Sequence, residues 1–407
     1  VMGIKGEPST PDDPAQGLVW AAIVGQIDRA GSESEFVSTA DTPRATFAKH
    51  PWSIGGGGAA ELTEAIEEHA TSRLNSFIAS AGFMAITGED EAFLTPTHLV
   101  PRLEVPVRDF ALGDEVRDWS LSSQGQVIFP YIKVGSSFEA PETEPGAAYD
   151  QLSWRNRSYL RSRVMFGKTA EQHGFRWDQY MQFIKERVDS DFLIAFAEVA
   201  THNHFVLDRG GKVFKQTAPV IKLPTGASED EHLGLLGLLN SSVACFWLKQ
   251  VSHQKQMMGG DGIRISEKSK VPYQFASTRV QELPLPAGWE NHALKPRLTE
   301  LAREADSLAG AIAEPSAAQV LADGLARGID IRGAWQQALD RRRAARSRAI
   351  LVQEEIDFTC YAMYGLAEQE DLRSEDLGWA VEVEAGDRPF CIASQRNVDG
   401  FDFPAKI

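Results

Sequence analysis

Two histidines in one short stretch are the residues whose types and spacing first suggest chemistry. The stretch "THNHFVLDRGGKVFKQTAPVIKLP" (201–224) opens with His202, Asn203 and His204. In a strand, side chains two residues apart share a face, so both imidazoles can reach one metal ion. A stable site needs a third ligand, and hydrolysis also needs a base. No Asp, Glu or His stands at a recognised spacing from the pair. The sequence therefore disfavours a metal-dependent nuclease, and we expect no metal site.

The same stretch has the pattern of a β-hairpin. "HFVL" and "KVFKQTAPVIKLP" suit strands, and Asp208-Arg209-Gly210-Gly211 suits the turn because glycine adopts positive φ freely. A two-stranded ribbon can enter the major groove of DNA, where cationic and amide side chains pair with base edges. The alternative is a structural hairpin whose lysines face solvent. The residues expected to contact DNA are Asn203, His204, Arg209, Lys212, Lys215 and Gln216.

An arginine cluster precedes this stretch. In "WRNRSYLRSRVMFGK" (154–168), four arginines are interleaved with Trp154 and Tyr159. Residues four apart share a helix face, so such a cluster suits phosphate contacts. A solvated helix face paired with acidic side chains is the alternative. The cluster comprises Arg155, Arg157, Arg161 and Arg163. A glycine-broken loop at 253–270 and the helix before it add the candidates Lys249, Lys255, Arg264, Lys268 and Lys270.

Charge is unevenly distributed along the 407 residues. The net charge of −16 argues against a nucleic-acid binder if the chain is taken whole. Residues 1–150 carry 9 Lys+Arg and 23 Asp+Glu, residues 151–280 carry 18 and 12, and residues 281–407 carry 14 and 22. A basic middle between acidic ends is the pattern expected if only the middle contacts phosphate. Double-stranded DNA is therefore the expected partner, and chance variation in an acidic protein is the alternative.

The cysteines and the apolar runs indicate a compartment. Cys245, Cys360 and Cys391 stand far apart with no paired spacing, which favours a reducing cytoplasm. The longest apolar run, at 233–248, contains Asn240 and is too short to span a membrane. No signal peptide is visible. We expect a cytoplasmic protein without a membrane partner.

Apolar periodicity predicts an α+β fold, with a β-rich N-terminal segment, a mixed α/β middle and a C-terminal helical region. The acidic, proline-containing segment 136–150 is the best linker candidate, and prolines at 281–289 close the middle. The expected domains are 1–150, 151–290 and 291–407. Strands are expected within 82–134, and helices at 59–80, 228–252, 293–313, 316–327 and 334–364.

Several stretches resemble a known family. "HNHFVLDRGGKVFKQTAPVIKLP", "LGLLGLLNSSVACFWLKQVSHQK" and "YQFASTRVQELPLPAGW" are similar to the target-recognition region of large adenine-specific DNA methyltransferases. These include single-chain type IIG and IIL restriction–modification enzymes and the PglX-like methyltransferases of BREX phage-exclusion systems. "GIKGEPSTPDDPAQGLVW", "HPWSIGGGGAAEL" and "GDEVRDW" resemble the segment after the catalytic core of the BREX proteins, and "LVQEEIDFTCYAMYGL" (351–366) resembles their C-terminal segment.

The resemblance implies a division of labour. Family members bind S-adenosylmethionine through a glycine loop and hold the extruded adenine with an Asn-Pro-Pro-aromatic motif, and this chain has neither. We therefore assign it no catalytic residue and no cofactor, and expect S-adenosylmethionine and the catalytic methyltransferase domain upstream of Val1, in a longer protein. Residues 1–150 would follow the catalytic core, and 151–290 would be the target-recognition domain.

The resemblance leads to one function and leaves an alternative. The expected function is DNA target recognition and duplex clamping for an adenine-N6-specific methyltransferase of a phage-defence system. The alternative is a protein-interaction module that docks other subunits of the defence complex. Its supports are the acidic first segment and the C-terminal helices rich in Ala, Arg and Glu.

Overall fold

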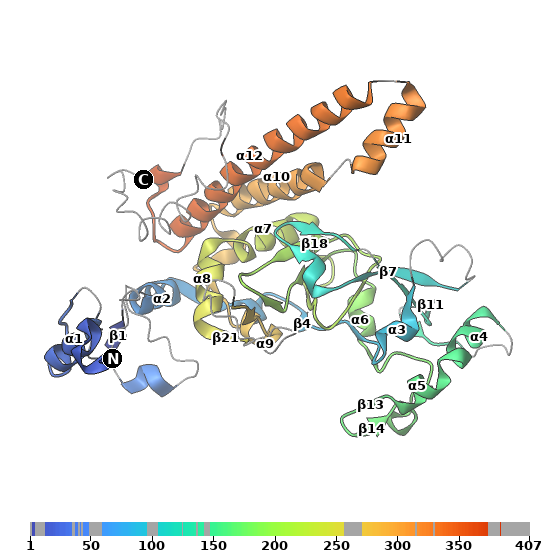
Figure 1. Ribbon diagram of the computed structural model, residues 1–407, viewed down its shortest axis with the longest axis horizontal. Coiled ribbons are helices and arrows are strands. Elements are labelled where there is room, and N and C mark those ends of the chain that lie inside the picture. Colours follow the sequence, from blue (N-terminus) through green and yellow to red (C-terminus); the bar gives the residue numbers. More distant parts are fainter. Residues whose placement is uncertain are drawn as a thin grey trace.

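Helices and several small sheets make up the chain, and the expected α+β class is confirmed. The longest helices lie in the C-terminal half, whereas most strands come from the first 222 residues (Figure 1). This computed structural model describes residues 2–4, 13–34, 37–39, 41, 44–48, 59–95, 105–123, 125–135, 137–141, 147–255, 271–313, 316–328, 330–372 and 383.

The central sheet is antiparallel and has four strands. Its order is β18 (Phe205–Asp208), β16 (Leu193–Phe196), β20 (Val220–Lys222) and β4 (Ser80–Gly82). Every residue of β16 and β18 is buried, as expected for strands covered on both faces. Strand β4 comes from far upstream, so the sheet joins segments on both sides of the expected linker.

A second sheet of four strands lies beside the first. Its order is β19 (Val213–Phe214), β7 (Val107–Ala111), β10 (Gly125–Ile128) and β6 (Leu94–Thr95). The β19–β7 pair is parallel, and the other pairs are antiparallel. Strands expected within 82–134 are therefore present, and the sheet also recruits one strand from the stretch that begins at Thr201.

The predicted hairpin at 201–224 is wrong in its pairing. The chain turns at Gly210 and Gly211, which have the expected positive φ values of 85° and 87°. However, β18 and β20 each pair with β16, which lies between them, and β19 pairs with β7. The physical reason is burial: β18 and β19 are apolar and fully buried, so each is inserted into a larger sheet rather than forming an exposed ribbon.

The helix expected at 228–252 is two helices. Helix α7 (Glu229–Leu239) begins at a capping box in which the Ser228 side chain accepts from the Glu231 backbone. Helix α8 (Ser242–Val251) has Ser241 as its N-cap, whose side chain accepts from the Ala244 backbone. A capping serine after Asn240 thus ends one helix and starts the next, although the apolar pattern continues.

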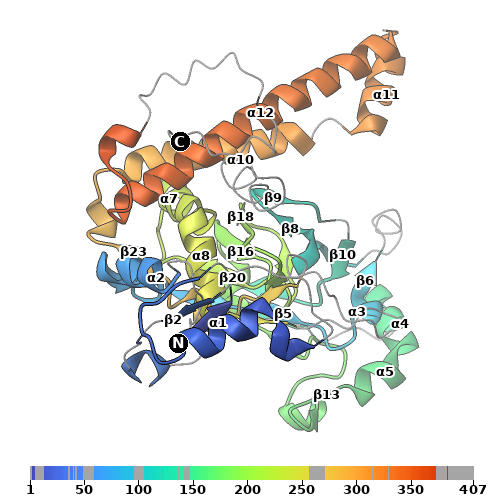
Figure 2. The same cartoon turned by 60° about the vertical axis from the view of Figure 1, so that its left-hand side comes forward.

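The three helices expected near the C-terminus are confirmed within a few residues. Helices α10 (Lys295–Ala313) and α12 (Ile331–Met363) lie side by side in both views, and α11 (Ala317–Arg327) lies at the far end of the pair (Figures 1 and 2). Helix α10 packs closely on α7, because a Cβ at Gly237 would come within 2.9 Å of Leu298 Cδ1. Among the described residues, no helix has the length and apolar character to cross a membrane.

The helix expected at 59–80 is shorter than predicted. Helix α2 (Ala59–Glu68) is followed by β3 (Ala70–Arg73), which pairs with β23 (Pro284–Pro286). Within the expected linker, β12 (Ser137–Glu139) pairs with β11 (Ile132–Val134), and residues 142–146 lie outside the described residues. The other elements are β1 (Met2–Ile4), α1 (Leu18–Gln26), β2 (Val37–Thr39), β5 (Ala85–Ile86), α3 (Asp90–Phe93), β15 (Gln182–Phe183), α6 (Lys185–Val188), β17 (Val199–Ala200), β21 (His253–Gln254), β22 (Tyr273–Gln274) and α9 (Ser277–Val280).

Two apolar clusters form the core. One contains buried side chains of α7, α8, α10 and α12 together with Leu74 and Trp119, so it spans all three expected domains. The other joins the second sheet to the central sheet through side chains such as Phe110, Val127 and Val206. The three-part division at about 150 and 290 stays a prediction, and the packing crosses both boundaries.

A separate segment extends away from the sheets. It consists of α4 (Ala148–Arg155), α5 (Arg157–Ser162) and the short hairpin of β13 (Val164–Met165) and β14 (Lys168–Thr169). Both views show it leaving the body of the molecule (Figures 1 and 2). We call residues 148–169 the arginine–aromatic projection, for the exposed side chains described below.

Candidate functional site

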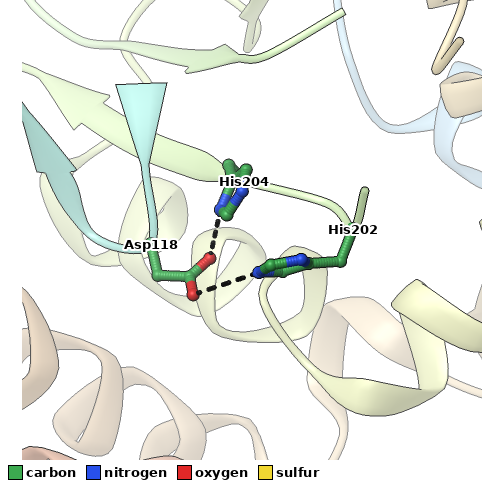
Figure 3. A group of neighbouring side chains, drawn as sticks. All are labelled: Asp118, His202 and His204. Carbon is green, nitrogen blue, oxygen red and sulfur yellow. Dashed lines mark hydrogen bonds and ion pairs between the residues drawn. The ribbon is translucent and has the colours of Figure 1, made fainter. Parts of the chain in front are cut away.

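Asp118, His202 and His204 lie together at the start of strand β18 (Figure 3). His204 Nδ1 donates a 2.6 Å hydrogen bond to Asp118 Oδ1, and His202 Nε2 lies 3.8 Å from Asp118 Oδ2. The centroids of the two imidazole rings are 4.2 Å apart. One ligand atom from each residue lies within 4.8 Å of the others. We call this group the Asp–His–His cluster.

A strained turn holds Asp118 in the cluster. Asp118 and Trp119 form the turn between β8 (Val116–Arg117) and β9 (Ser120–Leu121), and Trp119 has a φ of 60°. Left-handed backbone costs a bulky residue about 1–3 kcal/mol, so the surroundings must enforce it. The indole does so, because it is buried and donates a 3.0 Å hydrogen bond to Gln353. With Trp119 fixed in the core, Asp118 stays at the surface beside the histidines.

Buried amides hold the histidine side of the cluster. Asn203 is 5% exposed and donates through Nδ2 to the carbonyl of Leu239. Asn240 bonds the backbone of Phe205 twice, since its Oδ1 accepts from the N–H and its Nδ2 donates to the carbonyl, both at 3.0 Å. These bonds place Asn203 in the interior and leave His202 on the outside, next to Asp118.

One glutamine of α12 links both sides. Gln353 accepts from the Trp119 indole through Oε1 and donates through Nε2 to the Asn240 carbonyl at 3.2 Å. The backbone N–H of Trp119 also donates to the Phe205 carbonyl at 3.3 Å. The turn that carries Asp118 and the loop that carries the histidines are therefore held in register by buried hydrogen bonds.

The cluster favours a charged carboxylate. Burial alone would raise the pKa of Asp118, but hydrogen bonds and charge interactions with His202 and His204 outweigh it and hold the pKa well below its usual value. The Asp118 side chain is 55% exposed and that of His202 is 48% exposed, whereas that of His204 is 8% exposed. The arrangement thus offers an anionic oxygen and two imidazoles to an ion arriving from solvent.

An acidic group accompanies the two histidines, although no recognised spacing in the sequence indicates it. Asp118 stands 86 residues before His204, and β18 packs beside the turn between β8 and β9. No local spacing can reveal such a pair, because tertiary packing alone creates it. Asp118 lies in the "GDEVRDW" segment, which resembles the BREX proteins, and this resemblance is the one sequence feature that could have indicated Asp118.

The cations expected to line a DNA-reading hairpin are paired within the chain. Arg209 donates to Glu229 at 2.8 Å and lies 2.7 Å from Asp306. Lys212 lies 2.6 Å from the buried Asp208, and Lys215 pairs with Asp90. In this structure these three cations are engaged by carboxylates of the chain itself, and their contact with DNA stays a prediction. Removing Lys212 from Asp208 would leave a buried carboxylate without its cation, which is costly.

Arg163 also faces the interior, which disfavours its predicted phosphate contact. The side chain is buried, and its Nε donates to the Leu160 carbonyl at 2.9 Å. Its terminal nitrogens donate to the carbonyls of Thr87, Trp177 and Gln179. A guanidinium that satisfies four carbonyls braces the projection against the body rather than binding phosphate.

Asn203 and His204 also face the interior, which disfavours the DNA contacts predicted for them. Both residues are buried, at 5% and 7% exposed. The amide of Asn203 and Nδ1 of His204 are engaged with Leu239 and Asp118, as described above. Burial leaves these groups no route to a base edge.

The remaining arginines of the cluster gather on the arginine–aromatic projection. Arg155, Arg157 and Arg161 are exposed. Arg157 lies over the ring of Trp154, with its guanidinium carbon 4.7 Å from the ring centroid, and Arg161 lies 5.2 Å from that of Trp177. Arg161 also lies 4.0 Å from the exposed Glu171, a pairing worth little in solvent. Three of the four arginines in the predicted cluster are therefore accessible to a binding partner.

Exposed aromatic rings accompany these arginines. Trp154 is 51% exposed, Tyr159 68% and Phe166 83%. Phe166 stands in the turn between β13 and β14, where it and Gly167 have φ values of 49° and 76°. A two-residue turn of this kind favours Asn or Gly at its first position, so an exposed phenylalanine there is unusual. Trp154 and Tyr159 stand out in the sequence because they interleave with the arginines, whereas Phe166 lies beyond the last arginine and was not predicted.

Comparison with known proteins gives one relative over nearly the whole chain. The chain is 39% identical over 411 residues to "Adenine-specific methyltransferase PglX" of Streptomyces coelicolor, an alignment that covers 98% of this chain and 32% of that protein. The chain is a relative of PglX. The resemblance predicted from the sequence is confirmed, and the chain spans about a third of the length of this relative. No protein-family model matches the sequence.

Two solved restriction–modification enzymes are weakly similar in structure. The type IIL enzyme MmeI, solved in complex with DNA, has a TM-score of 0.41 and 11% identity, over 73% of this chain and 34% of that chain. The type IIG endonuclease BpuSI has a TM-score of 0.40 and 12% identity, over 85% and 38%.

The other predicted contacts are dispersed. Gln216 is exposed and lines a depression together with Lys215 and Asp90. Lys249 lies half-buried on α8, with Nζ 5.6 Å from the centroid of Tyr273, and Lys255 is exposed after β21. The predicted contacts Arg264, Lys268 and Lys270 lie outside the described residues.

Proposed function

We propose that this chain supplies DNA target recognition and duplex clamping to an adenine-N6-specific, S-adenosylmethionine-dependent DNA methyltransferase of a phage-defence system, of the BREX or restriction–modification kind. The chain has no Asn-Pro-Pro-aromatic motif and no cofactor-binding glycine loop. It therefore takes no chemical step itself. Its partners are double-stranded DNA and a catalytic methyltransferase domain, in the cytoplasm.

The similarity to PglX carries this proposal. The relative is named as an adenine-specific methyltransferase, and this chain aligns with about a third of it. Within that aligned third, the present chain has neither motif of the catalytic core. A methyltransferase must select its site and extrude its base from the duplex before reacting. The part of the protein without catalytic motifs is free to take on selection and clamping.

The arginine–aromatic projection is the surface that best fits DNA. Arg155, Arg157 and Arg161 are exposed and can each meet a backbone phosphate. In contrast, Arg209, Lys212 and Lys215 of the 201–224 stretch are paired with Asp and Glu of this chain. We therefore propose that the projection, rather than the 201–224 stretch, makes the main contact with DNA.

Phe166 gives the projection an apolar tip. Proteins that bend DNA insert apolar side chains between base steps and hold the adjacent phosphates with cations. Phe166 stands at the tip of its hairpin at 83% exposure, followed by the exposed Lys168 and preceded by Val164 at 62%. An aromatic ring at the end of a cationic projection fits insertion next to the base to be extruded.

A salt series with a mixed-sequence duplex tests the proposal. Fluorescence anisotropy of the labelled duplex gives the binding constant at several salt concentrations. The triple variant Arg155→Ala/Arg157→Ala/Arg161→Ala should bind more weakly. Its slope of log K against log salt should be shallower by about 0.9 for each arginine that meets a phosphate.

A charge-matched variant provides the control. Arg341, Arg343 and Arg346 are exposed on α12, and replacing them with Ala removes the same net charge far from the projection. This control should keep the salt slope of the unmodified chain. Equal losses in both triple variants would contradict a specific role for the projection, as would binding by the unmodified chain that does not depend on salt.

A second candidate function is docking of another protein. It is favoured by Leu321 and Leu325 of α11, which stand four residues apart and are 48% and 66% exposed at the far end of the α10–α12 pair. Replacing both with Ser should abolish capture of a defence-complex subunit and leave DNA binding intact if this function is correct. Unchanged capture would dismiss it.

A further inference from the structure

We propose that the Asp–His–His cluster is a binding site for one divalent transition-metal ion of the zinc class. The proposal stands apart from the proposed DNA function, because it rests only on the chemistry and geometry of Asp118, His202 and His204.

The donor set suits zinc. Two imidazole nitrogens and one carboxylate oxygen are ligands that Zn²⁺ and its neighbours prefer. Mg²⁺ and Ca²⁺ favour shells made of oxygen, so two histidines select against them. Three protein ligands leave the fourth position of a tetrahedral site to water or to an oxygen of another molecule.

The present distances need little change to accept the ion. Zinc bonds of about 2.0–2.1 Å in tetrahedral geometry place neighbouring ligand atoms about 3.3 Å apart. The carboxylate of Asp118 lies 2.6 Å from His204 Nδ1 and 3.8 Å from His202 Nε2, on either side of that value. The three ligand atoms already lie within 4.8 Å of one another, and a shift of the carboxylate that gives up its hydrogen bond to His204 would let them face one ion.

The cluster is held ready by residues that are not ligands. Trp119 and Gln353 fix the turn that carries Asp118, while Asn240 fixes the strand that follows His204. Thr201 Oγ1 lies 3.1 Å from Nδ1 of His202, which leaves Nε2 toward Asp118. Partners on the far nitrogen of a ligating histidine are a regular feature of metal sites, since they orient the ring.

Exposure gives the ion a way in and sets its effect. Asp118 and His202 are about half exposed, so the ion can enter from solvent, while His204 is almost buried and anchors it. A bound ion would join the β8–β9 turn to the loop before β18. An ion that binds the folded chain stabilises it according to the ratio of free ion to dissociation constant.

Titration with Zn²⁺ and Co²⁺ tests the proposal. The chain is first stripped with a chelator and dialysed, and Co²⁺ is added while visible absorption is recorded. We expect saturation at one Co²⁺ per chain with the intense bands of a four-coordinate site, displacement by one equivalent of Zn²⁺, and a rise in melting temperature with Zn²⁺ but not with Mg²⁺.

Variants locate the ion. His202→Ala removes one ligand and keeps the hydrogen bond between Asp118 and His204, so the fold should persist, and Zn²⁺ affinity should fall more than tenfold. His69→Ala removes an exposed histidine outside the cluster and should bind as the unmodified chain does. The proposal is overturned if no saturable equivalent of Co²⁺ binds, if Mg²⁺ protects equally, or if His202→Ala retains full affinity.

Discussion

Phe166 illustrates how much one residue of the arginine–aromatic projection is expected to contribute. Because the ring is 83% exposed, Phe166→Ala should leave the melting temperature unchanged. Stacking of an aromatic side chain on a base is worth about 1–3 kcal/mol, so duplex affinity should fall by that amount. Bending of a doubly labelled duplex, read by energy transfer between its ends, should decrease in parallel.

A nearby aromatic residue separates this effect from a general loss of apolar surface. Phe175 is 46% exposed and follows the projection in sequence, outside the β13–β14 turn. Phe175→Ala should retain affinity and bending. A Phe166→Ala chain that binds and bends DNA like the unmodified chain, while the triple arginine variant fails, would remove the insertion step and leave only phosphate clamping.

His232 of α7 predicts a pH dependence of stability. Burial lowers the pKa of His232, against smaller opposing effects from the Ser228 carbonyl and neighbouring glutamates. A histidine with a lowered folded-state pKa favours the folded state above its unfolded value of about 6.5. Below that value the unfolded chain takes up the proton first, so stability falls as pH falls.

The measurement is the urea midpoint of unfolding at pH 7.5 and pH 5.5. The unmodified chain should lose up to about 1.4 kcal/mol per pH unit from this histidine. His232→Asn can retain the 2.7 Å hydrogen bond to the Ser228 carbonyl without titrating, so its midpoint should change less between the two pH values. Identical pH profiles for both proteins would show that His232 does not contribute.

Asn240 ends α7 just before α8 begins, and we expect its replacement to lower the stability of the fold. Its amide satisfies both the N–H and the carbonyl of Phe205. Asn240→Ala would leave the Phe205 N–H in a buried region without its partner, at about 1–3 kcal/mol, whereas the carbonyl keeps the Trp119 N–H as a donor. Asn240→Asp keeps the acceptor and loses the donor, so its urea midpoint should fall between those of the other two proteins. Equal midpoints for Ala and Asp would contradict this account.

The same elements show what local sequence can and cannot predict. Helices α10, α11 and α12 were predicted closely because apolar spacing and caps such as Ser316 and Asp330 act within one helix. The pairing of β18, β19 and β20 was missed because each partner strand lies elsewhere in the chain. Periodicity identifies a strand and contains no information on which strand lies beside it.

The candidate site divides along the same line. The interleaved arginines and aromatic rings of the projection were visible as a local pattern, and three of four arginines are exposed. Arg163 looks identical in sequence, yet it is buried against the carbonyls of Thr87 and Gln179. Asp118 and the two histidines are brought together by tertiary contacts, so a local sequence pattern cannot predict the cluster.

Over the whole molecule, part of the uneven charge is used internally. The basic middle segment pairs with the acidic first segment through Lys215 and Asp90, and with the acidic last segment through Arg209 and Asp306. Packing of a basic segment against two acidic segments therefore explains part of the uneven charge without any contact with DNA. Among the described residues, Arg155, Arg157 and Arg161 of the projection extend beyond this packing, so we assign the proposed DNA surface to them.

Shared packing also predicts how the whole chain responds to truncation. Helices α10 and α12 cover α7 and α8, and Leu298 of α10 sits against Gly237 of α7. A chain that ends at residue 290, at an expected domain boundary, would expose Leu236, Leu239 and their neighbours to water. It should bind an apolar dye and lose its cooperative melting transition.

A deletion in the same C-terminal region that keeps the contact between α10 and α7 provides the comparison. Replacing residues 314–330 with a short Gly/Ser linker removes α11 and leaves the contact between α10 and α7 in place. That chain should melt cooperatively within a few degrees of the unmodified one. If residues 1–290 melt as sharply as the full chain, the boundary near 290 is a true domain border. If only the α11 deletion survives, the C-terminal helices are part of one folding unit with the sheets.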